Sequence, residues 1–217
     1  MNTKKNLKNS KWLPTLLLLA LLFVPKYVLA DDAAVLAQIE KANANVKTLV
    51  SPFTQTKVVA ATGTKKNLAG TLYYSAPDKV AQHYTQPASD LFLINGNQLC
   101  MARNGKKLHF DTAKNATMCA LRNTLIYCIQ GRTRTLAAEN SADITVSSDA
   151  KHYIVTLTSK KKLPRGYKTI VLHYTKSDAT LHIMQMDEFN GNSTIYTMTN
   201  YAIDQPVDAT VFAIPEK

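Results

Sequence analysis

The fold is decided by residues 70–101, GTLYYSAPDKVAQHYTQPASDLFLINGNQLCM, in which runs of β-branched and aromatic residues alternate with turn residues. The turns fall at Ser75-Ala76-Pro77-Asp78, at Gln86-Pro87 and at Asn95-Gly96-Asn97. Proline lacks the amide that a strand ladder needs, and Asn-Gly supplies the positive φ angles of a tight hairpin. The stretch therefore predicts four short antiparallel strands in a meander, whose large side chains line a curved surface.

Helix and strand patterns continue on both sides of this meander. A first helix is expected to begin at Asp31 or Asp32 and to be stopped by Pro52, after which residues 53–59 alternate as a strand. A second helix is expected over residues 115–130, ended by Gly131. The two apolar stripes are Val35, Leu36, Ile39, Ala42 and Val46, and then Met118, Leu121, Leu125, Cys128 and Ile129. From residue 142 onward the pattern predicts strands, so one antiparallel sheet with two helices accounts for every element.

The first thirty residues are typical of a cleaved signal peptide. Four lysines (Lys4, Lys5, Lys8 and Lys11) precede an apolar run over residues 12–24, and Val28-Leu29-Ala30 is a small-residue cleavage site. An uncleaved membrane anchor is the alternative, but the run is too short to span a bilayer and contains Pro14. We therefore expect a single exported domain over residues 31–217, located in the periplasm. No cysteine lies at the cleavage site, so the mature chain should not itself be lipid-anchored.

The charge balance favours a solubilising surface. The formal net charge of +11 falls to +6 once the five lysines of the signal peptide are removed. Such a surplus could attract anionic head groups or an acidic partner face. Nucleic acid is not expected as a partner, because the only dense basic run, Lys160-Lys161-Lys162, has no interleaved aromatic residues.

Three cysteines remain in the exported chain: Cys100, Cys119 and Cys128. An oxidising compartment permits one disulfide and leaves one thiol over. Cys119 and Cys128 are too far apart to be bridged on one intact helix, with a rise of roughly 13 Å between them. The open alternatives are a Cys100–Cys119 disulfide and three unpaired, buried thiols.

The sequence gives no support for catalysis or for a metal centre. It contains no nucleophile elbow, no phosphate-binding glycine loop and no His-Glu-x-x-His motif. The five histidines are scattered singly, and although His173 and His182 could face each other across a hairpin, no third ligand accompanies them at metal-site spacing. Asp187 and Glu188 would point to opposite faces of a strand. We therefore expect neither enzymatic activity nor a cofactor nor a metal ion.

A hydrophobic cavity is the more promising feature. Met184, Met186 and Met198 fall on facing strand segments, joined by Tyr73 or Tyr74, by Phe92 and by Tyr196. Methionine is flexible and polarizable, so such a wall can repack around chains of different length. Apolar alternation alone does not distinguish this cavity from a filled core in which methionine is a space-filling residue.

An ordered series of motifs resembles the LolA family of periplasmic lipoprotein carriers. The series begins with Phe53-Thr54-Gln55, Gly70-Thr71-Leu72, the strand between Pro77 and Pro87, and the run Leu91 to Gly96. It resumes with Met186-Asp187-Glu188-Phe189-Asn190-Gly191, then Ile203-Asp204, and finally Val211 to Pro215. The resemblance implies an incomplete antiparallel β-barrel with helices packed across its open side as a lid.

The resemblance also implies a function and its residues. Acyl chains of a lipoprotein or of another lipid would be held in the half-barrel by a monomer, received from an inner-membrane releasing complex and passed to an outer-membrane acceptor. Candidate cavity residues are Phe53, Leu72, Tyr74, Val80, Tyr84, Phe92, Met184, Met186 and Met198, and candidate lid residues are Met118, Leu121 and Leu125. The alternatives are a periplasmic lipid- or lipoprotein-sensing domain and an enzyme acting on lipid-linked substrates.

The chain departs from the family pattern at the lid lock. Proteobacterial members carry an Arg just before the proline of the Pro-initiated strand, where it hydrogen-bonds to the lid, and here that position is Ala76. The aromatic residue expected late in the same strand is replaced by Gln82 or displaced to Tyr84. The lid-locking contact of the family is therefore not expected in this chain, and a divergent member that serves another lipid or a biosynthetic cluster is left open.

Overall fold

The computed structural model describes residues 32–161 and 166–216. The signal peptide predicted over residues 1–30 lies outside the described residues. No helix among those described is long and apolar enough to cross a membrane.

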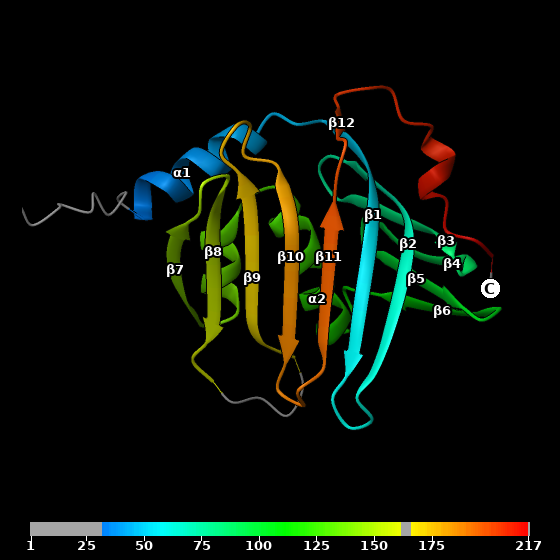
Figure 1. Cartoon of the computed structure of the whole chain (residues 1–217). Helices are drawn as coiled ribbons and strands as arrows, with labels where there is room; N and C mark the ends of the chain where they lie inside the picture. Colours follow the sequence, from blue (N-terminus) through cyan, green and yellow to red (C-terminus); the bar gives the residue numbers. More distant parts are fainter. Residues whose placement is uncertain (1–31, 162–165, 217) are drawn as a thin grey trace, which may run out of the picture.

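Within the described residues, one antiparallel sheet of twelve strands forms the body of the fold (Figure 1). Its strands are β1 (Thr48–Val59), β2 (Thr64–Ser75), β3 (Lys79–Gln86), β4 (Ala88–Asn95), β5 (Gln98–Arg103), β6 (Lys106–Asp111), β7 (Ala142–Ser148), β8 (His152–Ser159), β9 (Tyr167–Thr175), β10 (Leu181–Glu188), β11 (Ser193–Met198) and β12 (Ala202–Ile203). They lie in the order β6-β5-β4-β3-β2-β1-β11-β10-β9-β8-β7, and β12 pairs with β1. Because β6 and β7 are the two ends of this order, the sheet is an open half-barrel, as expected.

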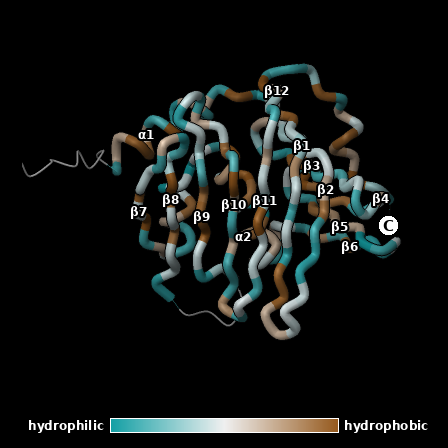
Figure 2. Tube along the Cα trace, in the orientation of Figure 1, coloured by the Kyte–Doolittle hydropathy of each residue, from teal (hydrophilic) through white to brown (hydrophobic). Residues whose placement is uncertain are grey.

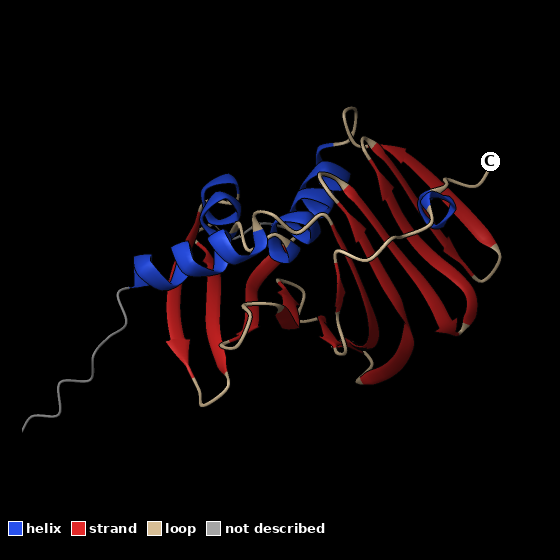
Figure 3. Ribbon diagram, turned by 90° about the horizontal axis from the view of Figure 1, so that it is seen from above, coloured by secondary structure: helices blue, strands red, loops and turns tan. Residues whose placement is uncertain are grey.

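The α-helices of the described residues lie on the concave side of the sheet (Figure 3). They are α1 (Asp32–Asn43), α2 (Ala116–Ile129) and α3 (Thr133–Glu139). The prediction of two helices was wrong, because it did not include α3. This helix has only seven residues and begins among the polar side chains that follow Gly131, so the sequence pattern did not reveal it. A 3-10 helix, η1 (Ala209–Phe212), packs near the other end of the sheet against β3 and β4.

The four-strand meander predicted for residues 70–101 is confirmed as β2 to β5. Its tightest point is Gly70, which is opposite Tyr84 at a β-bulge between β2 and β3. A Cβ atom at Gly70 would lie 2.2 Å from the main-chain oxygen of His83. Glycine is therefore required there because the neighbouring backbone occupies the space of a side chain.

The first strand is longer than expected, because Pro52 lies inside β1 and does not precede it. On one side β1 pairs with β12 only at Leu49 and Val50, and its pairing with β11 begins at Phe53. Pro52 falls in the gap between these two ladders. The amide that proline lacks therefore removes no ladder hydrogen bond, which is why the strand tolerates it.

The main core lies between the sheet and the helices. Alternate residues of the strands are buried against it, and Figure 2 shows hydrophilic and hydrophobic residues alternating along the strands. In α1, Val35, Leu36 and Ile39 are buried as predicted. Ala42 is exposed and Val46 lies beyond the helix end, so the last part of the predicted stripe was wrong. Asn43 is buried instead, where its Nδ2 donates to the main-chain oxygens of Ile39 and Ala179.

The three cysteines are free thiols. Cys100 is packed with Ala81, Leu93 and Phe212 in a second small core on the side of the sheet covered by η1. Cys119 and Cys128 belong to α2, on the concave side. The predicted Cys100–Cys119 disulfide is therefore wrong, because the sheet separates the two residues. The alternative of three unpaired thiols is confirmed, although Cys119 is only half-buried.

Candidate functional site

The candidate site lies around α2, along the concave face of the sheet. The side chain of Asn115 caps α2 by accepting a hydrogen bond from the Met118 amide at 3.1 Å. Gly131 ends the helix, with a φ of +67°. The buried residues of α2 all lie in its C-terminal half: Thr124, Leu125, Ile126, Cys128 and Ile129. The helix is therefore packed firmly at one end and loosely at the other.

The hydrogen bonds of α2 show the same asymmetry. At its C-terminal end, the Gln130 Nε2 atom donates to the Tyr74 hydroxyl at 2.9 Å and to the Pro77 main-chain oxygen at 2.8 Å. The Tyr174 hydroxyl donates to the Cys128 main-chain oxygen at 2.7 Å. Arg122, in the middle of the helix, lies 3.8 Å from the Asp78 carboxylate. In the described part of the chain, these residues make all the polar side-chain contacts between α2 and the sheet that we identify.

These contacts reach the turn that contains Ala76, the position where the family resemblance places an Arg. The side chain of Ala76 carries no donor, and the helix supplies the donor itself through Gln130, which reaches the turn between β2 and β3. Sequence reasoning missed Gln130 because it was treated only as the last residue of the helix. No local pattern identifies it, since its partners Tyr74 and Pro77 lie more than fifty positions earlier.

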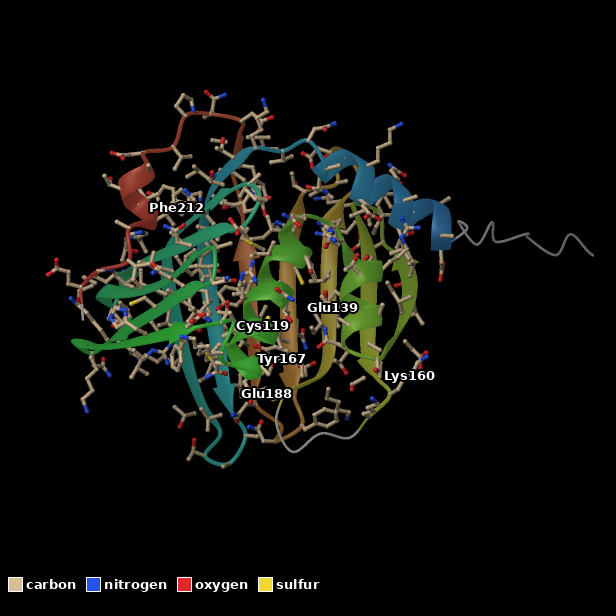
Figure 4. The ribbon with its side chains drawn as sticks, turned by 180° about the vertical axis from the view of Figure 1, so that it is seen from behind. Cys119, Glu139, Lys160, Tyr167, Glu188 and Phe212 are labelled. Carbon is tan, nitrogen blue, oxygen red and sulfur yellow. The ribbon has the colours of Figure 1, made fainter. Side chains whose placement is uncertain are left out.

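Two cavities flank the loosely packed half of α2. The meander cavity has a volume of about 540 Å³ and extends between α2 and strands β3 to β6, with β10 and β11 behind it. The α3 cavity has a volume of about 460 Å³ and lies on the other side, between α2, α3, β8 and β9. Leu121, Tyr167 and Glu188 line both cavities. Figure 4 shows Tyr167 and Glu188 near the lower end of α2 in that view.

The space directly beneath α2 is filled. A gap of only about 10 Å³ remains there, lined by nine residues that include five of the predicted cavity residues: Phe53, Leu72, Val80, Met184 and Met198. Three others, Tyr84, Phe92 and Met186, line the meander cavity together with the predicted lid residues Leu121 and Leu125. Met118 lines the α3 cavity. Tyr74 lines none of these spaces, because its hydroxyl is bound by Gln130.

The predicted residues are therefore divided between a filled centre and two open flanks, and their role in lipid binding stays a prediction. A further hollow of about 610 Å³ lies where β5 and β6 meet the C-terminal residues 214–216, and none of the predicted residues lines it.

Charged side chains surround the mouth of the meander cavity. Lys57, Arg103 and Lys106 contribute positive charge, and Asp90 and Glu188 contribute negative charge. Burial, with Arg103 as the next cause, lowers the pKa of Lys57 from 10.5 to about 8. The meander cavity therefore has an apolar interior, and basic side chains lie close to its entrance.

A buried polar network crosses the wall of this cavity. The Tyr84 hydroxyl donates to Gln55 Oε1 at 2.9 Å and lies 3.3 Å from Gln82 Oε1. Burial raises the pKa of the Tyr84 hydroxyl from its ordinary value of 10 to about 12. The Gln82 side chain that stands where an aromatic residue was expected thus takes part in a hydrogen-bonded cluster beside Phe53, whose ring meets that of Tyr84 edge-on at 5.2 Å.

The description of the histidines as scattered singly was wrong for three of them. His152, His173 and His182 come together where β8, β9 and β10 lie side by side: the ring of His152 is 5.7 Å from that of His173 and 5.2 Å from that of His182. His173 does lie beside His182 across the β9–β10 hairpin, and the missing third member is supplied by β8.

The family comparison agrees with this architecture. Residues 44–215 match the family model described as outer membrane lipoprotein carrier protein LolA. The chain belongs to the LolA family. None of the curated protein sequences matches it. Within the family it is a divergent member, since its identity to the solved structures is low.

Solved structures share the fold at low sequence identity. An uncharacterized conserved protein from Thermus thermophilus is 8% identical with a TM-score of 0.52, and the match covers 85% of this chain and 94% of that one. MucB is 10% identical with a TM-score of 0.53, over 86% of this chain and 63% of MucB. A LolA superfamily protein from Nitrosomonas europaea is 8% identical with a TM-score of 0.43, over 84% and 97%. These similarities concern the fold alone.

Proposed function

We propose that this LolA-family protein is a periplasmic carrier that binds acyl chains of lipoproteins, or of a related lipid, and delivers them toward the outer membrane. The observation that carries the proposal is the pair of cavities, about 540 and 460 Å³, on either side of the loosely held half of α2. Both volumes lie in the range of small-molecule binding sites. The proposed action is binding and release without catalysis.

The energetics explain why a carrier needs such spaces. Removing an acyl chain from a membrane costs about 0.8 kcal/mol per CH₂ group, so a sixteen-carbon chain represents roughly 12 kcal/mol. A carrier has to replace most of this with apolar wall and still release the chain. The methionines Met184, Met186 and Met198 suit this purpose, since a methionine wall repacks at low cost.

We infer that a chain enters by way of the meander cavity. Leu108, on the edge strand β6, lines this cavity and is 56% exposed, which makes it an apolar residue at the entrance. Lys57, Arg103 and Lys106 would lie near the polar head of a lipid whose chain points inward. Movement of the loosely held half of α2 would join the two cavities, because Leu121 on that half lines both.

The test is lipid uptake by the mature protein and by variants with a charge inside the cavity. Met186→Glu and Phe92→Glu place a carboxylate in the meander cavity and should abolish uptake of a fluorescent fatty acid and of an acylated lipoprotein. The matched control is Thr54→Glu, which adds the same charge at an exposed position of strand β1. Circular dichroism would show that the variants remain folded.

Native mass spectrometry of the protein purified from the periplasm supplies an independent readout. The proposal predicts a bound acylated molecule that is lost on organic extraction. Folded Met186→Glu and Phe92→Glu variants that take up lipid like the wild type would refute it, and so would a wild-type protein that binds no lipid in either assay.

A further inference from the structure

The outer face of the sheet carries a cluster of histidine and aspartate side chains that the proposed carrier function does not use. Side chains alternate along a strand, and in β9 Leu172 and Tyr174 are buried toward the helices while His173 between them points to the opposite face. In β8 the inward residues are Tyr153 and Val155, so His152 lies on the same outer face as His173. The cluster and the candidate lipid site are therefore on opposite sides of the sheet.

Three groups converge there. One ligand atom each from Asp149, His152 and His173 lies within 4.8 Å of the other two. Asp149 belongs to the turn before β8, and its Oδ1 atom accepts hydrogen bonds from the amides of Lys151 and His152, each at 2.7 Å. Its Oδ2 atom lies 3.1 Å from the Nδ1 atom of His152. The turn thus holds the Asp149 carboxylate next to the imidazole of His152. The pairing of β8 with β9 places the imidazole of His173 beside them.

We propose that Asp149, His152 and His173 form a binding site for a divalent transition-metal ion, with Zn²⁺ as the ion that fits best. Two imidazoles and one carboxylate are ligands that Zn²⁺ takes readily, and three protein ligands leave a fourth position open. A tetrahedral ion about 2.1 Å from each ligand holds the ligand atoms about 3.4 Å apart. The Asp149–His152 separation of 3.1 Å is close to this value, and the ligand atom of His173, within 4.8 Å of the other two, has to move closer to complete the site.

The surroundings support the site. The ring of His182 stacks on that of His152 with an angle of 2° between the planes, and its Nδ1 donates to the Met198 main-chain oxygen at 2.7 Å. This neighbour limits rotation of His152, as supporting groups do around metal ligands. Lys176 lies in the same region, and its ammonium group donates to the main-chain oxygen of Asp149 at 2.6 Å, which leaves the carboxylate to the histidines.

The experiment uses mature protein purified without a histidine tag and stripped of metal with a chelator. Co²⁺ is titrated and followed by its visible absorption, and Zn²⁺ is then added in competition. We expect one Co²⁺ per chain, displaced by Zn²⁺. Removing one ligand in Asp149→Asn or His173→Gln should lower the affinity for Co²⁺ at least about 10- to 100-fold. Losses of this size are typical even when the residue removed only hydrogen-bonds to a metal ligand. His109→Gln, on β6, is the matched control and should bind like the wild type.

Thermal melting provides the second measurement. Zn²⁺ should raise the melting temperature of the wild type and of His109→Gln, and should leave Asp149→Asn and His173→Gln unchanged, because only an ion bound by the folded state stabilises it. Wild-type protein that binds no Co²⁺ below millimolar concentration would overturn the proposal. Equal binding by the wild type and both ligand variants would do the same, since the ion would then be held elsewhere.

Discussion

The most informative perturbation is Gln130→Ala, which removes the contacts that hold the C-terminal end of α2 to the meander. Gln130 donates two hydrogen bonds, to Tyr74 at 2.9 Å and to Pro77 at 2.8 Å. A hydrogen bond of this kind contributes about 1 kcal/mol net, so the loss of both weakens the closed position of α2 by about 2 kcal/mol. This corresponds to a roughly 30-fold rise in the population in which α2 is detached.

Hydrogen exchange measures this change directly. In the Gln130→Ala variant, the α2 amides should exchange roughly 30-fold faster, and those of β8 to β10 should exchange at the wild-type rate. Uptake of a fluorescent fatty acid should also become faster, because a larger fraction of molecules is open to it.

The matched control is Asn123→Ala. This residue is also on α2, but its Nδ2 atom donates to Glu139 of α3 at 3.1 Å and makes no hydrogen bond to the sheet that we identify. Its loss should leave uptake unchanged. Two results would refute the reasoning about Gln130: α2 exchange that stays at the wild-type rate, or exchange that accelerates equally across the whole sheet, since the residue would then contribute only to global stability.

Three further predictions concern stability and are checked by denaturant unfolding. Lys57→Met should stabilise the protein by about 1–3 kcal/mol at pH 7. The pKa of Lys57 is lowered to about 8 in the folded state, so wild-type stability should rise between pH 8 and 10.5, where only the unfolded chain keeps the proton, and the variant should lose this rise. Gly70→Ala should lower the free energy of unfolding by more than about 3 kcal/mol, because its Cβ would overlap the main chain of β3. Gly63→Ala, at a positive φ in open space, should cost only about 1–2 kcal/mol. Equal losses of stability in the two variants would contradict the overlap at Gly70. Tyr174→Phe should cost about 1 kcal/mol because it removes the buried hydrogen bond from the Tyr174 hydroxyl and leaves the Cys128 carbonyl with only the longer contact to the Gly131 amide, at 3.3 Å. A neutral effect would show that water replaces the hydroxyl.

Local pattern was sufficient to predict most of the fold. The Asn95-Gly96 turn and the prolines at 77 and 87 marked the meander correctly, and Gly131 marked the end of α2. The failures come from places where tertiary context decides. Pro52 lies inside β1 only because two partner strands leave a gap beside it, and the seven residues of α3 are too few to show a helical period.

The candidate site was harder to predict because packing and strand register are not local properties. Apolar alternation marked Phe53, Met184 and Met198 as inward-facing, which is correct, but it carries no information on whether the space they face is filled. The histidine cluster depends on the pairing of β8 with β9, which places His152 close to His173, 21 positions later in the chain. A hairpin pattern is sufficient to predict that His173 and His182 are neighbours. The cluster can be predicted only when the position of β8, which carries His152, is also known.

The alternation of side chains also separates the two proposals. Leu172 and Tyr174 pack under the helices, and His173 between them faces outward, so a substitution at His173 leaves the packing beneath α2 in place. Conversely, Met186 faces the meander cavity and lies outside the set of metal ligands. A His173→Gln variant that loses metal and still takes up lipid, together with a Met186→Glu variant that loses lipid and still binds metal, would show that one sheet serves two independent binding functions on its two faces. Loss of both activities in either variant would instead indicate a damaged sheet, and unfolding measurements on the same samples would reveal it.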